Sequence, residues 1–298
     1  MEIGYVGLGK MGINMVKRLM AAGHKVVAFN RGEEGRERGM GAGLDVRDSL
    51  AEMIAGLSPK RKIVWLMVSH TGVDETLKNI LPLLKTGDIL IDGGNSFYED
   101  TLRRAKLVES KGVRYVDAGV SGGPGGAASG ACIMVGGDKK IFNIIKPIIK
   151  DAAAPQAFQH LGSVGAGHFA KMIHNGIEYG MMQAIAEGFS ILRKSSFEFD
   201  MKRLAELYNN RSVIESRLVG WLRDGLNKYG DNLDFISGVV AHTGEGEWTV
   251  KTARKLGVPA KIISESFNFR KQSAKKGDSY QGRVLMAMRN QFGGHSIK

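Results

Sequence analysis

The first half of the chain alternates short hydrophobic runs with amphipathic segments. The runs are rich in valine and isoleucine and are short, which favours strands over buried helices. The segments between them, such as residues 11–22 and 98–111, repeat their hydrophobic positions with a helical period. Alternation of this kind predicts βαβ units and a parallel sheet that is covered on both faces. The expected strands are residues 3–6, 25–29, 63–68, 89–92, 115–118 and 133–135.

After about Gly162 the strand pattern fades and helical periodicity takes over. A chain of 298 residues has the right length for two domains. We therefore expect an α/β domain over residues 1–164 and an all-α domain over residues 165–298. The expected helices of the second domain cover residues 167–193, 201–209, 216–228, 246–256, 262–275 and 279–290.

Composition narrows the class of protein. Hydrophobic residues make up 43% of the chain, which is enough for globular cores. The single cysteine, Cys132, excludes an internal disulfide and leaves no zinc-type cysteine spacing, so we expect no metal. We find neither a leader pattern nor an apolar run of about 18 residues, and we expect a cytoplasmic protein without a membrane partner.

The formal net charge of +12 needs a separate explanation. Nucleic-acid binding is one alternative, but the basic residues are spread along the chain and form no block with interleaved aromatic residues. A basic enzyme that attracts anionic small molecules explains the charge equally well. We expect an anionic substrate and no nucleic-acid partner.

The first expected strand leads directly into the motif Gly7-Leu8-Gly9-Lys10-Met11-Gly12. A GxGxxG motif between a strand and a helix is typical of dinucleotide binding. The first glycine makes the tight turn, the second lets the backbone approach the pyrophosphate, and the third allows close packing of the helix. The alternative is an ordinary glycine turn. The position of the motif favours a Rossmann-type doubly wound sheet that binds NAD or NADP through these six residues.

The residue after the second strand reads the adenine ribose in such domains. An Asp or Glu there would favour NAD, whereas this chain has Asn30, followed by Arg31 and Gly32. Asn30 does not repel a 2′-phosphate, and Arg31 can pair with one, so the sequence favours NADP over NAD. Glu33 and Glu34 follow directly and oppose this preference. The alternative is that Arg31 stacks on the adenine and leaves the two cofactors poorly discriminated.

Two further segments follow strands, at the edge of the sheet where ligands bind in open α/β folds. Val68 ends the third expected strand, Ser69 and His70 follow it, and we expect all three to contact the cofactor. Asn95, in the segment 92–96, is placed to reach both nicotinamide and substrate. An equal alternative is that Asn95 or Ser96 caps the next helix.

A glycine-rich segment, residues 120–127, also follows a strand. As a loop, its Ser121, Gly122 and Gly123 would offer a hydroxyl and backbone N–H groups to an anion such as a carboxylate. The alternative is a flexible connection without a ligand.

Residues 165–179 hold the most concentrated candidate chemistry. In a helix, Lys171, His174, Asn175 and Glu178 lie at i, i+3, i+4 and i+7 and share one face. This face would present a candidate base, an imidazole, an amide and a candidate acid; the alternative is a solvated Lys–Glu surface. Gly176 lies inside the expected helix at a cost of up to about 1 kcal/mol relative to alanine. We therefore expect a neighbouring group to press against it.

Together these motifs resemble the 6-phosphogluconate dehydrogenases, in their short form, within the β-hydroxyacid dehydrogenase superfamily. The resemblance runs from Gly7 to His295. Its discriminating parts are the segment 92–96, the Lys171 helix extended to Tyr179, and the tail from Arg289 to His295. One departure is Thr243, which stands where long-chain members have a substrate-binding lysine and leaves the phosphate contacts open.

The resemblance implies a set of substrate contacts and an oligomer. Arg270 falls where the family has a phosphate-binding arginine, and Arg289 and His295 reach into the neighbouring subunit's substrate site in this family. The helical domain then serves substrate binding and oligomerisation, with dimer or tetramer left open. The other expected substrate-binding residues are Asn95, Ser121, Gly122, Gly123, His174, Asn175 and Tyr179.

The activity that the resemblance implies is oxidative decarboxylation of 6-phosphogluconate to ribulose 5-phosphate and CO₂ with NAD(P)⁺, a step of the pentose phosphate pathway. Lys171 would take the proton from the C3 hydroxyl and later return it, Glu178 would protonate the enediol, and Asn175 would orient the substrate. A non-decarboxylating β-hydroxyacid dehydrogenase, of the 3-hydroxyisobutyrate type, is one alternative. A catalytically silent NADP-binding protein is another.

Overall fold

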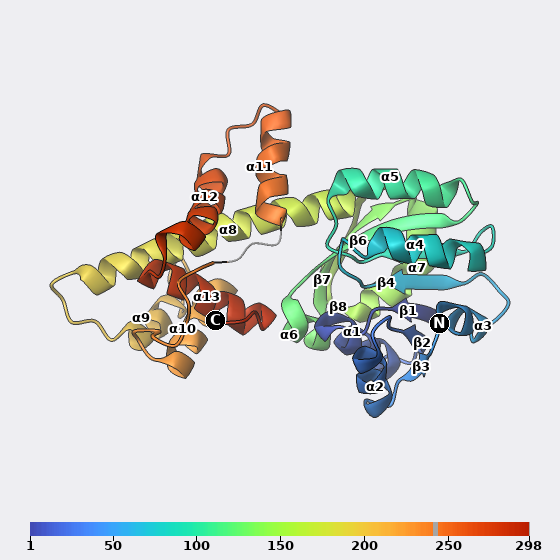
Figure 1. Ribbon diagram of the computed structural model, residues 1–298, viewed down its shortest axis with the longest axis horizontal. Helices are drawn as coiled ribbons and strands as arrows, with labels where there is room; N and C mark the ends of the chain where they lie inside the picture. Colours follow the sequence, from blue (N-terminus) through green and yellow to red (C-terminus); the bar gives the residue numbers. More distant parts are fainter. Residues whose placement is uncertain (241–243, 298) are drawn as a thin grey trace. The chain divides into compact units, whose positions relative to one another are not determined.

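The computed structural model describes residues 1–240 and 244–297 and divides the chain into two compact units. The first unit is Met1–Lys171 and the second is Met172–Lys298. The boundary between the two units, between Lys171 and Met172, falls within one long helix, α8, Ala166–Lys194. Figure 1 gives the order of the elements along the chain. Thr243, the residue at which the sequence departs from the long-chain members, lies outside the described residues.

The first unit holds an eight-stranded sheet with the strand order β3-β2-β1-β4-β5-β6-β7-β8. The order of the first six strands is that of dinucleotide-binding domains. All neighbouring strands are parallel except β6 and β7, which run antiparallel. The strands are β1 Glu2–Val6, β2 Lys25–Phe29, β3 Asp45–Arg47, β4 Ile63–Leu66, β5 Ile89–Asp92, β6 Arg114–Ser121, β7 Ala131–Gly137 and β8 Ala153–Gly162.

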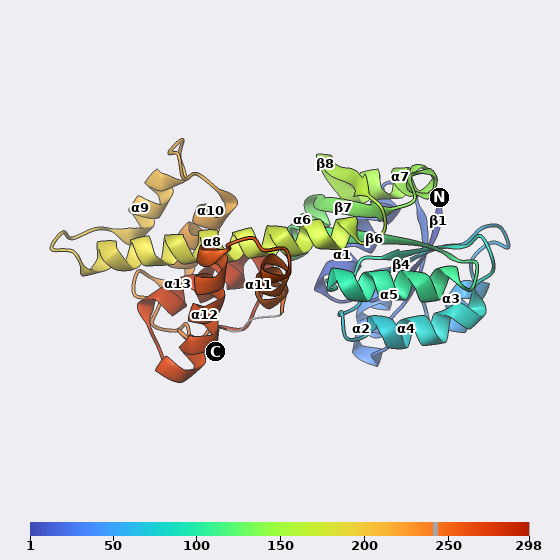
Figure 2. The same ribbon diagram turned by 90° about the horizontal axis from the view of Figure 1, so that it is seen from above.

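Successive strand side chains enter two different cores, as the period of two requires. Ile63 and Trp65 belong to the core that also holds residues of α1 and α7, whereas Val64 and Leu66 belong to the core with α3, α4 and α5. Both faces of the sheet are therefore covered by helices (Figure 2). The helices of this unit are α1 Lys10–Ala21, α2 Glu33–Gly41, α3 Leu50–Ala55, α4 Val73–Ile80, α5 Tyr98–Glu109, α6 Gly123–Ser129 and α7 Lys139–Ala152, with the 3₁₀ turn η1 Leu81–Leu83.

The described part of the second unit is helical. Its core is formed by side chains such as Met182 of α8, Leu222 of α10 and Leu285 of α13, all fully buried. Within residues 1–240 and 244–297, no helix combines the length and the apolar character that a membrane span requires. The helices after α8 are α9 Met201–Tyr208, α10 Arg217–Tyr229, α11 Glu245–Lys255, α12 Lys261–Lys276 and α13 Tyr280–Gly293.

The α/β then all-α fold class is confirmed, and each expected strand is present, residues 25–29 and 89–92 with the expected ends and the other four with shifted ends. Two strands were missed. β3 has only three residues, all partly exposed, and β8 is an edge strand of mostly exposed or partly exposed residues. Neither carries the hydrophobic signal of a buried strand. The expectation of a fully parallel sheet is wrong at β7, which returns antiparallel beside β6.

The start of α8 is fixed to the sheet by Asp117 of β6. This carboxylate is fully buried and accepts hydrogen bonds from the backbone nitrogens of Gly165 and His168, at 2.7 and 2.8 Å. It thereby satisfies two of the backbone donors that a helix start leaves without helical partners. The helix approaches the sheet so closely that an added Cβ at Gly167 would lie 2.4 Å from the backbone oxygen of Met134.

We expect Asp117→Ala to lower the free energy of unfolding by about 3 kcal/mol, because it leaves two buried N–H groups without acceptors. The measurement is denaturant unfolding followed by far-UV circular dichroism. Asp138→Ala is the matched control, since Asp138 caps α7 through the nitrogens of Lys140 and Ile141 but is exposed. The control should lose clearly less stability. Equal losses in the two variants would contradict the assigned role of Asp117.

Candidate active site

The glycine motif forms the turn between β1 and α1. Gly7 has φ +105°, and an added Cβ there would lie 2.3 Å from the backbone oxygen of Met67. An added Cβ at Gly12 would lie 1.9 Å from the backbone oxygen of Gly7. Packing therefore requires both glycines. By contrast, an added Cβ at Gly9 would meet nothing within 4 Å, so this glycine leaves open room at the helix start.

This arrangement fits a dinucleotide. Gly9 is the N-cap residue of α1, where backbone N–H groups and the helix dipole favour an anion. Gly9 and Lys10 are exposed, whereas Leu8 is buried and Met11 is partly buried. The exposed helix start and the open space at Gly9 are what a bound pyrophosphate needs.

Asn30 follows β2 and braces the glycine loop. Its Oδ1 accepts a hydrogen bond from the backbone nitrogen of Leu8 at 2.9 Å, and its Nδ2 donates to the backbone oxygen of Gly32 at 2.8 Å. Arg31 is exposed and forms an ion pair with Glu75 of α4. Arg36 donates to the backbone oxygen of Arg31 at 2.8 Å. Glu75 and Arg36 were not singled out from the sequence, because only the fold brings them to Arg31.

The two loops after β4 and β5 carry the next predicted residues. In the first loop, Val68 and His70 are partly buried and Ser69 is exposed. In the second, Asn95 is exposed and Ser96 is buried. The capping alternative is wrong, because α5 begins at Tyr98 with Phe97 as its N-cap residue. Instead, Oγ of Ser96 accepts a hydrogen bond from Arg104 at 2.8 Å.

The segment 120–127 differs from the expected loop. β6 continues through Ser121, and α6 begins at Gly123, so Gly122 alone connects them. Gly122 and Gly123 have φ values of +128° and +63°, which glycine adopts without strain. The small residues that were taken for a loop permit this abrupt change from strand to helix. Ser121, Gly122 and Gly123 are partly exposed at the end of β6.

Lys171 is the last residue of the first unit. Its side chain is buried, with 8% of the residue exposed. It packs on β6 so tightly that an added Cβ at Gly119 would lie 2.4 Å from the Cβ of Lys171. Gly119 is therefore the residue that lets this part of α8 approach the sheet.

The other residues of the predicted stripe follow along α8 in the second unit. His174 Nδ1 lies 2.9 Å from Oδ1 of Asn175 and 3.9 Å from Oε2 of Glu178. Asn175 is buried, whereas the side chains of His174 and Glu178 are partly exposed. The expected neighbour of Gly176 is Thr249, whose Cγ2 would lie 2.5 Å from an added Cβ.

Glu245 is a buried carboxylate that the sequence analysis missed. It opens α11 and accepts a hydrogen bond from Nδ2 of Asn175 at 3.4 Å. A sequence signal was present, because an acidic residue between two glycines at a helix start is well placed to face a neighbouring polar group. Its partner could not be identified without the fold.

Two buried arginines lie beside Tyr179. Arg270 of α12 and Arg289 of α13 are 3% and 4% exposed, and the guanidinium carbon of Arg270 lies 3.3 Å from the centre of the Tyr179 ring. Their guanidinium groups donate hydrogen bonds to the sulfur atoms of Met182 and Met286, which are weak acceptors. In the described part of the chain, neither arginine has a carboxylate within ion-pair distance.

Burial dominates the electrostatics of this pair. It lowers the pKa of Arg270 to about 10, with the neighbouring Arg289 acting in the same direction and Tyr179, Glu178 and Glu245 opposing the change. Burial also lowers the pKa of Arg289, while Tyr179, Glu245 and Glu178 oppose the change. Both groups stay cationic at neutral pH, and a buried cation without a close anion is unfavourable. The site is therefore suited to an anionic ligand.

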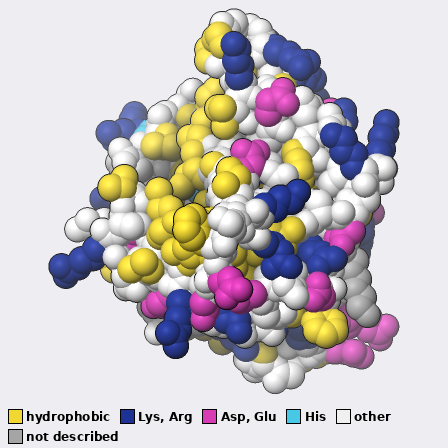
Figure 3. Space-filling model, turned by 90° about the vertical axis from the view of Figure 1, so that its left-hand side faces the viewer, with side chains coloured by type: hydrophobic (Ala, Val, Ile, Leu, Met, Phe, Trp, Pro, Cys, Tyr) yellow, Lys and Arg dark blue, Asp and Glu magenta, His cyan; other side chains and the backbone are white. Residues whose placement is uncertain are grey.

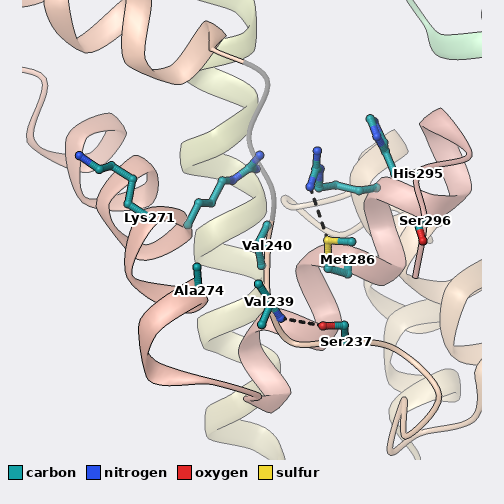
Figure 4. A pocket seen from close by; sticks show the side chains of 10 residues that line it. Ser237, Val239, Val240, Lys271, Ala274, Met286, His295 and Ser296 are labelled. Atoms are coloured by element: carbon teal, nitrogen blue, oxygen red, sulfur yellow. Dashed lines mark hydrogen bonds between the residues drawn. The ribbon is translucent and has the colours of Figure 1, made fainter. Parts of the chain in front are cut away.

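The two arginines line a cavity of about 650 Å³ within the second unit, a size typical of small-molecule sites. Figure 4 shows Lys271 and Ala274 on one side of the cavity and His295 and Ser296 on the other. The tail is not a loose end over its described residues. Asn290 donates to the backbone oxygen of His295 at 2.8 Å, and Ser237 donates to that of Ile297 at 2.7 Å.

The structure thus gathers Tyr179, Arg270, Arg289 and His295 in one chain, with Asn175 and Glu178 on the same helix as Tyr179. Completion of a neighbour's site by Arg289 and His295 stays a prediction. The glycine motif, Asn30 and Arg31 gather in the first unit, as do the loops with His70 and Asn95.

Family models match both parts of the chain. Residues 2–165 match the NAD binding domain of 6-phosphogluconate dehydrogenase, and residues 167–297 match the 6-phosphogluconate dehydrogenase C-terminal domain. The Bacillus subtilis protein YqeC is 43% identical over 100% of this chain and 99% of its own length. An NAD(+)-dependent, decarboxylating 6-phosphogluconate dehydrogenase of Haloferax volcanii is 37% identical over 100% of this chain and 98% of its own length.

Solved structures agree on the fold. The Plasmodium falciparum 6-phosphogluconate dehydrogenase, studied with its cofactor NADP⁺ and its substrate 6-phosphogluconate, has a TM-score of 0.84 and 32% identity, covering 93% of this chain and 62% of that one. A Mycobacterium tuberculosis 3-hydroxyisobutyrate dehydrogenase shares the fold, with a TM-score of 0.75 and 24% identity over 97% of this chain and 99% of its own. With its NAD(P)-binding domain and its helical domain both matched, the chain belongs to the 6-phosphogluconate dehydrogenase family and is an NAD(P)-dependent oxidoreductase.

Proposed function

We propose that this protein oxidises and decarboxylates 6-phosphogluconate to ribulose 5-phosphate and CO₂, as in the pentose phosphate pathway. The observation that carries the proposal is the buried pair Arg270 and Arg289 in a cavity of about 650 Å³. A substrate phosphate would supply the anion that these guanidinium groups lack, through charge-assisted hydrogen bonds. His295 and Tyr179 lie beside the same groups and are the further phosphate contacts of the proposal.

Residues 1–164 form the cofactor-binding domain of this proposal, and residues 165–298 form the substrate domain. NADP is the preferred cofactor, because Asn30 adds no negative charge where the 2′-phosphate would lie and Arg31 offers a cation. Arg31 must first leave Glu75, with which it forms an ion pair. That competition reduces the preference without reversing it, since exposed ion pairs contribute less than about 1 kcal/mol.

The bound nicotinamide would accept the hydride from C3 of the substrate. Lys171, acting as a neutral amine, takes the proton of the C3 hydroxyl as the hydride leaves. The ketone now lies β to the carboxylate, so the carbon–carbon bond to the carboxylate breaks, CO₂ leaves, and the electron pair moves toward the C3 oxygen. Protonated Lys171 then donates its proton to that oxygen. Asn95, Ser121 and the backbone at Gly122 and Gly123 hold the carboxylate end.

The remaining enediol needs a proton on the carbon that lost the carboxylate. Glu178 is the acid of this step, and His174 and Asn175 orient the substrate hydroxyls. Glu245 holds Asn175 by the hydrogen bond of 3.4 Å. The order along α8 supports these roles, because Lys171, His174, Asn175 and Glu178 recur on one face of a continuous helix.

The proposed assembly is a homo-oligomer. Its support is the apolar surface of the second unit, on which large hydrophobic side chains are exposed; Figure 3 shows hydrophobic side chains gathered in a band on one face. A second copy of the chain would cover such a surface. The exposed large hydrophobic side chains of the second unit include Ile191, Phe197, Leu207, Val213, Phe235 and Ile262.

A non-decarboxylating β-hydroxyacid dehydrogenase is the second candidate, favoured by the fold that the chain shares with 3-hydroxyisobutyrate dehydrogenase. Such a substrate has no phosphate for Arg270 and Arg289. A catalytically silent NADP-binding protein is the third candidate, and the complete set of Lys171, Asn175 and Glu178 argues against it.

The deciding experiment mixes the purified protein with 6-phosphogluconate and NADP or NAD, and follows reduced cofactor and released CO₂. We expect one CO₂ for each reduced cofactor. Reduction without CO₂ would replace the proposal by the non-decarboxylating candidate. Cofactor binding without reduction of either cofactor by any sugar acid would favour the silent protein.

Lys171→Met should lower kcat about a thousandfold, because the variant lacks the general base. Its affinity for NADP, measured by calorimetry, should stay within about twofold of the unaltered protein, since the glycine loop is untouched. Lys194→Met is the control, because Lys194 ends the same helix and is exposed. A Lys171→Met enzyme with near-normal turnover would exclude this lysine as the base.

Arg270→Gln should reduce kcat/KM for 6-phosphogluconate at least about tenfold, the value of one charge-assisted hydrogen bond, and should leave kcat/KM for gluconate nearly unchanged. Steady-state kinetics with both sugar acids measure this ratio. The control is Lys275→Gln, an exposed cation on the same helix. If both substrates lose equally, Arg270 does not read the phosphate.

Glu75→Gln should lower KM for NADP by up to about fivefold and leave KM for NAD unchanged, because it frees Arg31 for the 2′-phosphate. Glu206→Gln makes the same charge change in the second unit, where Glu206 pairs with Arg223 at 3.3 Å. An equal effect of Glu75→Gln on both cofactors would exclude selective competition for Arg31.

A further inference from the structure

A buried arginine outside the proposed chemistry ties together the loops after β4 and β5. Arg104 lies in α5 and is 3% exposed. Its Nε and Nη2 donate to the two carboxylate oxygens of Asp74, at 3.1 and 2.9 Å. Nη2 also donates to the backbone oxygen of His70 at 3.0 Å, and Nη1 donates to Oγ of Ser96 at 2.8 Å. The planar guanidinium group therefore forms hydrogen bonds with one residue of each loop and with Asp74 at the start of α4.

The two loops are also packed against each other. An added Cβ at Gly94, in the loop after β5, would lie 3.1 Å from the backbone oxygen of Val68, in the loop after β4. The backbone nitrogen of Gly94 donates to Oδ1 of Asp92 at 2.9 Å, and the hydroxyl of Tyr115 donates to Oδ2 at 2.6 Å. A shift of one loop must therefore disturb the other.

The position of these loops in the sheet assigns them to one half of the cofactor. In a sheet of this strand order, the dinucleotide lies across the carboxyl ends of the strands, with one half on each side of the switch point between β1 and β4. The glycine motif and Asn30, after β1 and β2, lie on the adenosine side. The loops held by Arg104, after β4 and β5, lie on the nicotinamide side.

We propose that Arg104 is a positioning residue for the nicotinamide half of the cofactor, through its hydrogen bonds to the His70 backbone and the Ser96 hydroxyl. The proposal rests on the proposed function of the site as an NAD(P) site. Arg104 sets the course of both loops and thereby the place of Asn95, which adjoins Ser96. A lysine cannot replace it, because a single ammonium group lacks the planar fork that reaches Asp74 and both loops at once.

Arg103 provides a matched comparison in the same helix. It also donates to Asp74, at 2.9 Å, and to Asp100, at 3.4 Å, but within residues 1–240 and 244–297 it forms no hydrogen bond with either loop. Its side chain is 55% exposed, against 3% for Arg104. The same substitution at these adjacent positions therefore separates loop positioning from the pairing with Asp74.

The test compares Arg104→Lys with Arg103→Lys by calorimetry, using NADP and its 2′-phospho-ADP-ribose fragment, which lacks nicotinamide. We expect Arg104→Lys to weaken NADP binding about tenfold and to leave fragment binding within about twofold, with no change in Arg103→Lys. We also expect Arg104→Lys to lower kcat by at least the same factor and to leave KM for 6-phosphogluconate nearly unchanged. Equal losses for NADP and its fragment would overturn the proposal, as would unchanged NADP binding.

Ser96→Ala tests the same proposal if Arg104→Lys does not fold. It removes one of the loop contacts and leaves the pairing of Arg104 with Asp74 in place. A smaller loss for NADP alone is expected, and the double variant should be less than additive, because both changes break one hydrogen bond. Full additivity would overturn the proposal. The binding measurement needs no turnover, so it tests this proposal even if the protein does not catalyse the proposed reaction.

Discussion

The attachment of α8 to the sheet is the constraint on which the rest of the site depends. The buried carboxylate of Asp117 accepts two backbone hydrogen bonds from the helix start, and Gly119 and Gly167 remove the side chains that would hold the helix away. A helix so fixed has little freedom to slide or rotate at this end. The backbone of Lys171 is thereby held against Gly119 of β6, and its side chain is buried there.

The sequence was sufficient for the fold class and for most elements, because periodic hydrophobic positions report directly on buried faces. It failed where that signal is absent. The edge strand β8 carries mostly exposed or partly exposed residues, and the glycine-rich segment after β6 looks like a loop although α6 begins at Gly123. Local composition there describes flexibility, whereas tertiary packing decides the conformation.

The candidate residues divide in the same way. Lys171, Asn175 and Glu178 could be chosen from the sequence, because a helical stripe is a local pattern. Arg104 could not, and the local signal at Glu245 identified no partner, because the importance of both residues arises from partners 8 to 70 positions away along the chain. Both are charged groups inside the protein, and a buried charge needs partners that only the folded chain can supply. Burial of the charge, once known, is what reveals them.

The continuity of α8 has a consequence for how this chain can vary. One residue added within residues 171–178 would turn every later position by about 100° around the helix axis and shift it by about 1.5 Å. The candidate base would then point one way and the candidate acid another. Loops elsewhere can lengthen or shorten at small cost. In this stretch of α8 a substitution changes one side chain, whereas a single insertion changes the direction of every candidate side chain that follows it.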